Sequence, residues 1–174
     1  MAAVSTSRRS TAGIVLAVAG VLLALAILIP QLGGPALPWL TAISLLAIAA
    51  AFLILGFGAV NSSAAKITLI AAALGWLVLG LAAFGLALPN VIIILAVLLA
   101  GVVGLLAAVI LYVGKEVRNV PAIVFIITTA LGLLYLLPRL GVALAGLTLV
   151  IAILFAAGLI VSGVLFWQKE RGRR

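Results

Sequence analysis

The chain has 174 residues, of which 68% are hydrophobic and 7% charged, and it carries ten Lys and Arg residues against two acids. Soluble globular proteins are nearer half apolar and a quarter charged, so this composition predicts an integral membrane protein. Cysteine and histidine are absent and the acids are Glu116 and Glu170. This excludes disulfides, thiolate or imidazole metal sites and Cys or His dyads, and a carboxylate pair would require these two distant residues to meet.

Six apolar runs follow along the chain, each long enough or nearly long enough to cross a hydrocarbon core of about 30 Å. The alternating polarity of β-barrel strands is missing, so the runs are predicted to be helices. We expect them at residues 12–29, 38–60, 67–88, 91–113, 120–137 and 141–167. The prediction is an all-α integral membrane protein with a six-helix transmembrane domain at 12–167, an N-terminal tail at 1–11 and a basic C-terminal tail at 168–174.

The basic residues divide the connections into two alternating sets. The segments "SRRS", "NSSAAK", "GKEVRN" and "QKERGRR" hold nine of the ten, whereas the other connections hold only Arg139. Positive charge favours the cytoplasmic side, so both termini are predicted to be cytoplasmic in a multi-pass protein of the inner (plasma) membrane. Pro30, Pro89 and Pro138 stand in the opposite connections and favour helix ends there. The predicted architecture is therefore a bundle of three outward-turning hairpins.

Small residues recur at helical spacing in three of the runs. In the fourth run Ala96, Ala100, Gly104 and Ala108 follow at intervals of four and form a smooth ridge where another helix can approach closely. Similar faces occur in the first run, around Gly13, and in the sixth. These ridges pack either within the chain or between copies. A leucine at Gly104 is expected to push a close neighbour away.

Arg139 is a full charge within the apolar stretch "LYLLPRLGVAL". The preceding run has 18 residues, about 27 Å as a helix, which holds Arg139 near the outer membrane boundary. There its stem can stay in apolar surroundings while the guanidinium reaches the lipid phosphates. Arg139 is thus interpreted as an interfacial anchor. The alternative is a site for a lipid headgroup or anion, with Tyr135, one helical turn earlier, supplying a hydroxyl.

The polar residues inside the runs carry hydroxyl groups. The direction in which these hydroxyls point distinguishes a transport function from a structural one. Ser44, Thr128, Thr129 and Thr148 would favour transport if they converged on one water-accessible cavity. Bonds back to the helices would favour a structural role. Trp76, near the middle of the third run, is interpreted as a packing residue.

Three segments, "AGIVLAVAGVLLALAILIP", "AALGWLVLGLAAFGLALP" and "GLIVSGVLFW", resemble the HdeD-like family of small six-span bacterial membrane proteins. The resemblance implies a role in acid or envelope stress and no known catalytic site. We therefore expect a non-enzymatic structural or stress-related protein without catalytic residues, metal or cofactor. Its partners would be the lipid bilayer and a second copy or another membrane protein, and not nucleic acid. The alternatives are an uncoupled facilitator or pore for a small neutral or apolar solute, and an accessory subunit of a larger membrane complex.

Overall fold

In a computed structural model, the described residues, 2–58, 60–117, 120–144 and 146–171, form helices joined by short connections; for residues 2–7 and 169–171 only the backbone is described. The elements are α1 (Ala2–Gln31), α2 (Pro38–Gly58), α3 (Ser63–Ala83), α4 (Asn90–Leu98), the π-helix η1 (Leu99–Val103), α5 (Gly104–Val113), α6 (Val120–Leu136), the 3₁₀ helix η2 (Leu137–Leu140) and α7 (Thr148–Arg171). Within these described ranges, six helical spans are long and apolar enough to cross a membrane. The prediction of an all-helical fold with six helices able to span a membrane is confirmed for the described residues.

The helices are apolar on their exposed faces as well as on their buried ones. On α1 the buried positions Ala12, Leu16, Ala19 and Leu23 follow helical spacing, and so does the exposed set. That exposed set is Ile14, Val18, Val21, Leu25 and Leu28. Large apolar surfaces of this kind are rare on soluble monomers but carry no cost against lipid. The outer faces of the bundle are therefore suited to direct contact with a bilayer.

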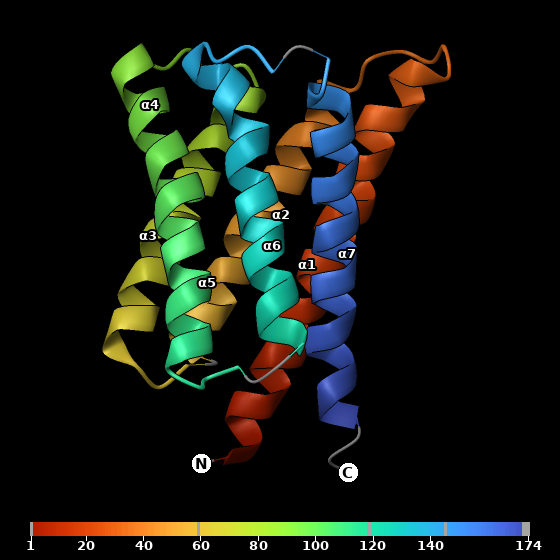
Figure 1. The fold of residues 1–174 in the computed structure, drawn as a ribbon. Helices are drawn as coiled ribbons and strands as arrows, with labels where there is room; N and C mark the ends of the chain where they lie inside the picture. Colours follow the sequence, from red (N-terminus) through yellow and green to blue (C-terminus); the bar gives the residue numbers. More distant parts are fainter. Residues whose placement is uncertain (1, 59, 118–119, 145, 172–174) are drawn as a thin grey trace.

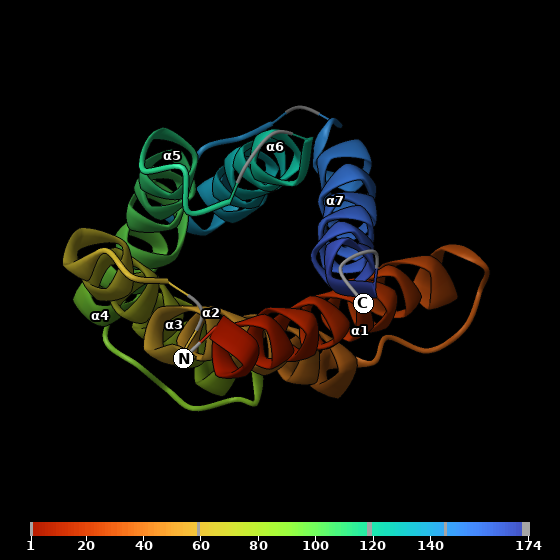
Figure 2. The ribbon, with the colours of Figure 1, turned by 90° about the horizontal axis from the view of Figure 1, so that it is seen from below.

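The helices stand side by side in a closed ring. Each packs against its neighbours in the order α1, α2, α3, the continuous α4–η1–α5 span, α6 and α7, and α7 packs in turn against α1 (Figure 2). The chain ends lie at the same end of the ring, where the α2–α3 and α5–α6 connections also lie (Figure 1). Because the first and last helices are in contact, the ring closes within one chain.

Several helix boundaries in the structure differ from the predicted ones. The last helix begins at Thr148 instead of residue 141, because the preceding segment contains Gly141 and Gly146 at φ of 81° and 83°, which a right-handed helix excludes. The third helix ends at Ala83, before Gly85 at φ 93°, and not at residue 88. At the N-terminus, α1 begins at Ala2 and runs through the predicted tail, while α7 continues to Arg171.

Candidate functional site

A layer of stacked aromatic side chains lies inside the ring, toward the end opposite the termini. Phe155 of α7 lies between Trp76 of α3, with ring centroids 5.8 Å apart, and Tyr135 of α6, at 5.4 Å. Gly132 makes room for this stack, since a Cβ there would lie 2.9 Å from the Phe155 ring. Trp76 is 3% exposed, as expected of a packing residue. Its contact with Phe155 joins two helices that are not neighbours in the ring.

A second aromatic layer lies nearer the end that holds the termini. Phe125 of α6 contacts Phe52 of α2 at 5.6 Å and Phe166 of α7 at 5.5 Å between centroids. All three rings are buried. The Phe52–Phe125 contact again crosses the ring, and aromatic pairs in these geometries contribute about 0.5–1.5 kcal/mol beyond their burial. The centre of the bundle is therefore packed with side chains at two depths.

The buried hydroxyls near this centre are bonded to helices. Thr128 donates to the Val124 carbonyl at 2.8 Å, and its oxygen lies 2.9 Å from the Ser162 hydroxyl of α7. A hydroxyl has one hydrogen to donate, so Ser162 is the donor in the second bond. Gly158 gives Thr128 the room it needs, because a Cβ there would meet the Thr128 oxygen at 2.7 Å. Gly158 and Ser162, one turn apart on α7, thus form the contact surface for Thr128 of α6.

The remaining hydroxyls do not converge on this pair. Ser44 of α2 donates to the Ala19 carbonyl of α1 at 2.8 Å. Thr129 bonds back to the carbonyls of Phe125 and Ile126, at 3.0 and 2.9 Å. Thr148 is exposed as the first residue of α7. The bonds are scattered over three places in the bundle, the pattern expected of a structural role.

The predicted ridge of the fourth span lies inside the chain. Ala96, Ala100, Gly104 and Ala108 are all buried. The closest approach is at Gly75 of α3, where a Cβ would lie 2.6 Å from the Ala96 carbonyl oxygen and closer still to the Ala100 nitrogen. At Gly104 a Cβ would only touch Ala72 and Phe52 at 3.7 and 3.8 Å. Alanine therefore fits at Gly104, and the effect of a leucine there stays a prediction.

The structure places Arg139 and Tyr135 in different surroundings. Arg139 is exposed in η2, at the end of the bundle opposite the termini. The Tyr135 ring is partly buried and stacks on Phe155 inside the bundle. The shared lipid or anion site at these two residues stays a prediction. Exposure of Arg139 at a helix end agrees with its interpretation as an anchor.

A polar network that the sequence did not predict joins three segments at the end that holds the termini. One oxygen of Glu116 accepts from the backbone N–H groups of Asn61 and Ser62, at 3.1 and 2.9 Å. The other oxygen lies 3.8 Å from a guanidinium nitrogen of Arg9. Ser62 is the N-cap of α3, so the carboxylate sits beside the positive end of that helix dipole. Glu116 thereby connects α1, the start of α3 and the end of α5.

The end of α5 sets the position of Glu116. The Glu116 N–H donates to Leu111 and the Lys115 N–H to Tyr112, each at 3.1 Å, and Lys115 has φ of 55°. This is the Schellman arrangement of a helix end, in which the left-handed residue is usually glycine. The turn directs the next side chain, Glu116, toward the α2–α3 connection. The local sequence "GKE" could have suggested the turn. No local signal indicates which residues the Glu116 carboxylate contacts.

Among the described residues there is no group of three or more His, Cys, Asp or Glu side chains that could hold a metal ion. What this arrangement can do is hold helices together, through aromatic stacking, buried hydroxyl bonds and one carboxylate network. Comparison of the chain with models of known families, with characterised proteins and with solved structures found no match.

Proposed function

We propose that the protein is a non-enzymatic, multi-pass protein of the bacterial cell membrane with a structural role, and that it does not conduct solutes. The observation that supports this proposal most directly is which side chains occupy the inside of the ring. Two aromatic layers fill it, and the buried hydroxyls of Ser44, Thr128, Thr129 and Ser162 bond helix carbonyls or each other. A solute path needs polar groups that face a shared wet space, whereas here Ser44 and the Thr128–Ser162 pair join neighbouring helices and Thr129 bonds back to its own helix.

We propose that lipid surrounds the bundle. Association of copies through the small-residue ridges is not part of this proposal. The ridge from Ala96 to Ala108 is buried by helices of the same chain, so a second copy or partner protein would have to bind elsewhere. The role in acid or envelope stress rests on the resemblance to the HdeD-like family alone.

The proposed orientation places the end with the termini in the cytoplasm, with three hairpins that turn on the outer side. Its support is the charge distribution, since nine of the ten basic residues belong to the termini and to the α2–α3 and α5–α6 segments. These segments lie together at one end of the bundle (Figure 1). Positive charge retained on the cytoplasmic side is the general rule for short loops.

A second candidate, an uncoupled facilitator for a small neutral solute, is favoured by one observation. The indole N–H of Trp76 is buried without a hydrogen-bond partner. Such a group costs about 1–3 kcal/mol when it is left unsatisfied. In a ring of helices, a donor of this kind could serve a passing solute, with the aromatic stack acting as a gate.

Permeability of proteoliposomes separates the two functions. We expect liposomes that contain the wild-type chain to equilibrate water, glycerol and urea no faster than protein-free liposomes in stopped-flow light scattering, because the stacked rings leave no polar path. Trp76→Phe is the matched variant, since it keeps an aromatic ring and removes the N–H. Faster flux with the wild type that Trp76→Phe slows would overturn the structural proposal and support the facilitator.

A further inference from the structure

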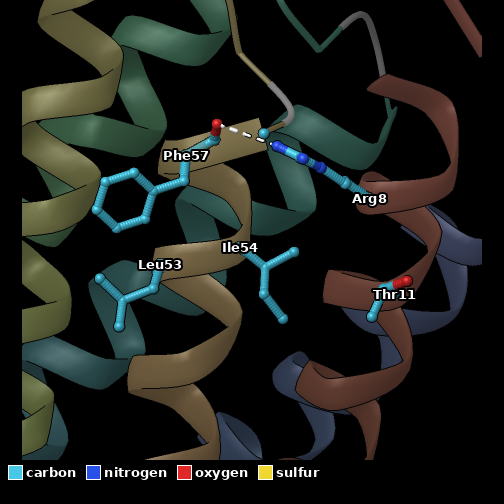
Figure 3. Close-up of a pocket in the computed structure, with 6 residues that line it drawn as sticks. Arg8, Thr11, Leu53, Ile54 and Phe57 are labelled. Carbon is cyan, nitrogen blue, oxygen red and sulfur yellow. Dashed lines mark hydrogen bonds between the residues drawn. The ribbon is translucent and has the colours of Figure 1, made fainter. Parts of the chain in front are cut away.

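A pocket of about 370 Å³ lies between α1 and α2 at the end that holds the termini. Its lining consists of Arg8, Thr11, Leu53, Ile54, Phe57 and Gly58. The α2 residues among these are apolar except for the backbone, and Phe57 is 68% exposed. In Figure 3 the Arg8 side chain reaches from α1 to the end of α2, with Ile54 below it between the two helices and the Leu53 and Phe57 side chains on the other side of α2. The pocket thus has an apolar wall and one guanidinium at its polar end.

Gly58 is the residue that allows Arg8 to occupy this position. A Cβ built at Gly58 would fall on the Arg8 side chain, with Nη1 at 2.6 Å and Nε at 2.9 Å and the Cδ carbon closer still. Arg8 Nη1 donates to the Phe57 carbonyl at 3.4 Å, a long bond to the negative end of the α2 dipole. A guanidinium has five N–H donors in a planar fork. Capping α2 therefore accounts for only one of them.

Arg9, the next residue, is directed elsewhere. Its guanidinium is 3.8 Å from Glu116, so its charge is partly offset by the carboxylate. Arg8 is the cation that faces the pocket, where the wall suits an acyl chain and the fork suits two oxygens of a phosphate. From this charge complementarity we infer that the pocket binds an anionic phospholipid, with the headgroup phosphate at Arg8 and an acyl chain along Leu53, Ile54 and Phe57.

The inference rests on this geometry and holds whether the chain is structural or a facilitator. It also differs from the predicted site at Arg139, which lies at the opposite end of the bundle. The competing explanation is that Arg8 only caps α2. A cap would lower stability when it is removed but would show no preference among lipids.

Native mass spectrometry of the full chain with phosphatidylglycerol, or with phosphatidylcholine of the same acyl chains, tests the inference. Wild type should retain phosphatidylglycerol in preference, and Arg8→Gln should bind it about tenfold more weakly, the effect of losing a charge-assisted bond. Gly58→Ala keeps every charge but displaces Arg8, and it should lose the same preference. Lys66→Gln is the matched control, because it removes one positive charge outside the pocket lining, and it should bind like wild type. Arg139→Gln tests the alternative site at the opposite end of the bundle.

Three results would overturn the site. They are equal retention of the two lipids by wild type, unchanged binding by both Arg8→Gln and Gly58→Ala, and loss of binding in Arg139→Gln alone. The last would assign the lipid to the opposite end of the bundle. The folded fractions of Arg8→Gln and Gly58→Ala are compared by circular dichroism before the lipids are added. A loss of binding is then not confused with a loss of fold.

Discussion

Replacing Gly163 with alanine is expected to lower the stability of the protein by about 2 kcal/mol, within the range for overpacked interiors. Gly163 lies where α7 closes the ring against α1. A Cβ there would lie 2.5 Å from the Ala17 nitrogen, 2.8 Å from the Ala17 Cβ and closer still to the Gly13 carbonyl oxygen. The contact is reciprocal, because a Cβ at Gly13 would lie 2.6 Å from the Gly163 oxygen. Backbone atoms cannot rotate away, so the two helices must separate.

Gly104→Ala is the matched control, since it adds the same methyl group to another buried helical glycine. Its nearest neighbours would be at ordinary contact distance, 3.7 and 3.8 Å. Alanine is favoured over glycine within helices by about 1 kcal/mol, so this variant should match or exceed wild type. The midpoint of thermal unfolding in mild detergent measures both. Equal midpoints for Gly163→Ala and Gly104→Ala would show that α1 and α7 are not in close contact.

Replacing Glu116 with alanine should cost about 2–3 kcal/mol, as for hydrogen bonds to a charged group. The carboxylate accepts from Asn61 and Ser62 and pairs with Arg9, and its side chain is 11% exposed. Its removal leaves the N–H groups of Asn61 and Ser62, just before the first turn of α3, without this acceptor. We expect a lower unfolding midpoint and faster amide exchange confined first to residues 60–62.

Glu116→Gln separates the hydrogen bonds from the ion pair. Glutamine keeps a carbonyl oxygen that can accept from the two backbone N–H groups, and it loses the attraction to Arg9 and to the positive end of the α3 dipole. Because the Arg9 side chain is 26% exposed, that pair should contribute less than about 1 kcal/mol. Glutamine should therefore fall between alanine and wild type. Alanine that unfolds and exchanges like wild type would mean that Glu116 does not hold the α2–α3 connection.

Hydropathy was enough to predict six spanning helices, because each run is apolar around its whole circumference. The same uniformity explains the errors in the boundaries. Residues 141–147 and 84–88 are as apolar as the helices beside them, and only the positive φ of Gly85, Gly141 and Gly146 ends the helices there. The π-helix at Leu99–Val103 differs from the helices beside it in its backbone hydrogen-bond pattern. Hydropathy cannot predict this difference, because it depends only on side-chain polarity.

The order of helices around the ring and the partners of its polar groups could not be predicted. With lipid outside and apolar side chains inside, no hydrophobic face marks the side of a helix that will be buried. Gly104 and Gly75 look alike in sequence, yet only Gly75 meets a neighbouring backbone. Glu116 stands 54 residues from Ser62, and a local pattern cannot indicate a contact at that separation.

The central claim, that the chain crosses the membrane six times with its basic end in the cytoplasm, is tested most directly by topology reporters. Paired cytoplasmic and periplasmic reporters would be fused at Ser63, at Val117 and after Arg174, and also at Gly34 and Asn90. We expect cytoplasmic activity at the first three positions and activity on the outer side at the other two, following the positive-inside rule. A fusion after Arg174 that is active on the outer side would contradict the six-span arrangement.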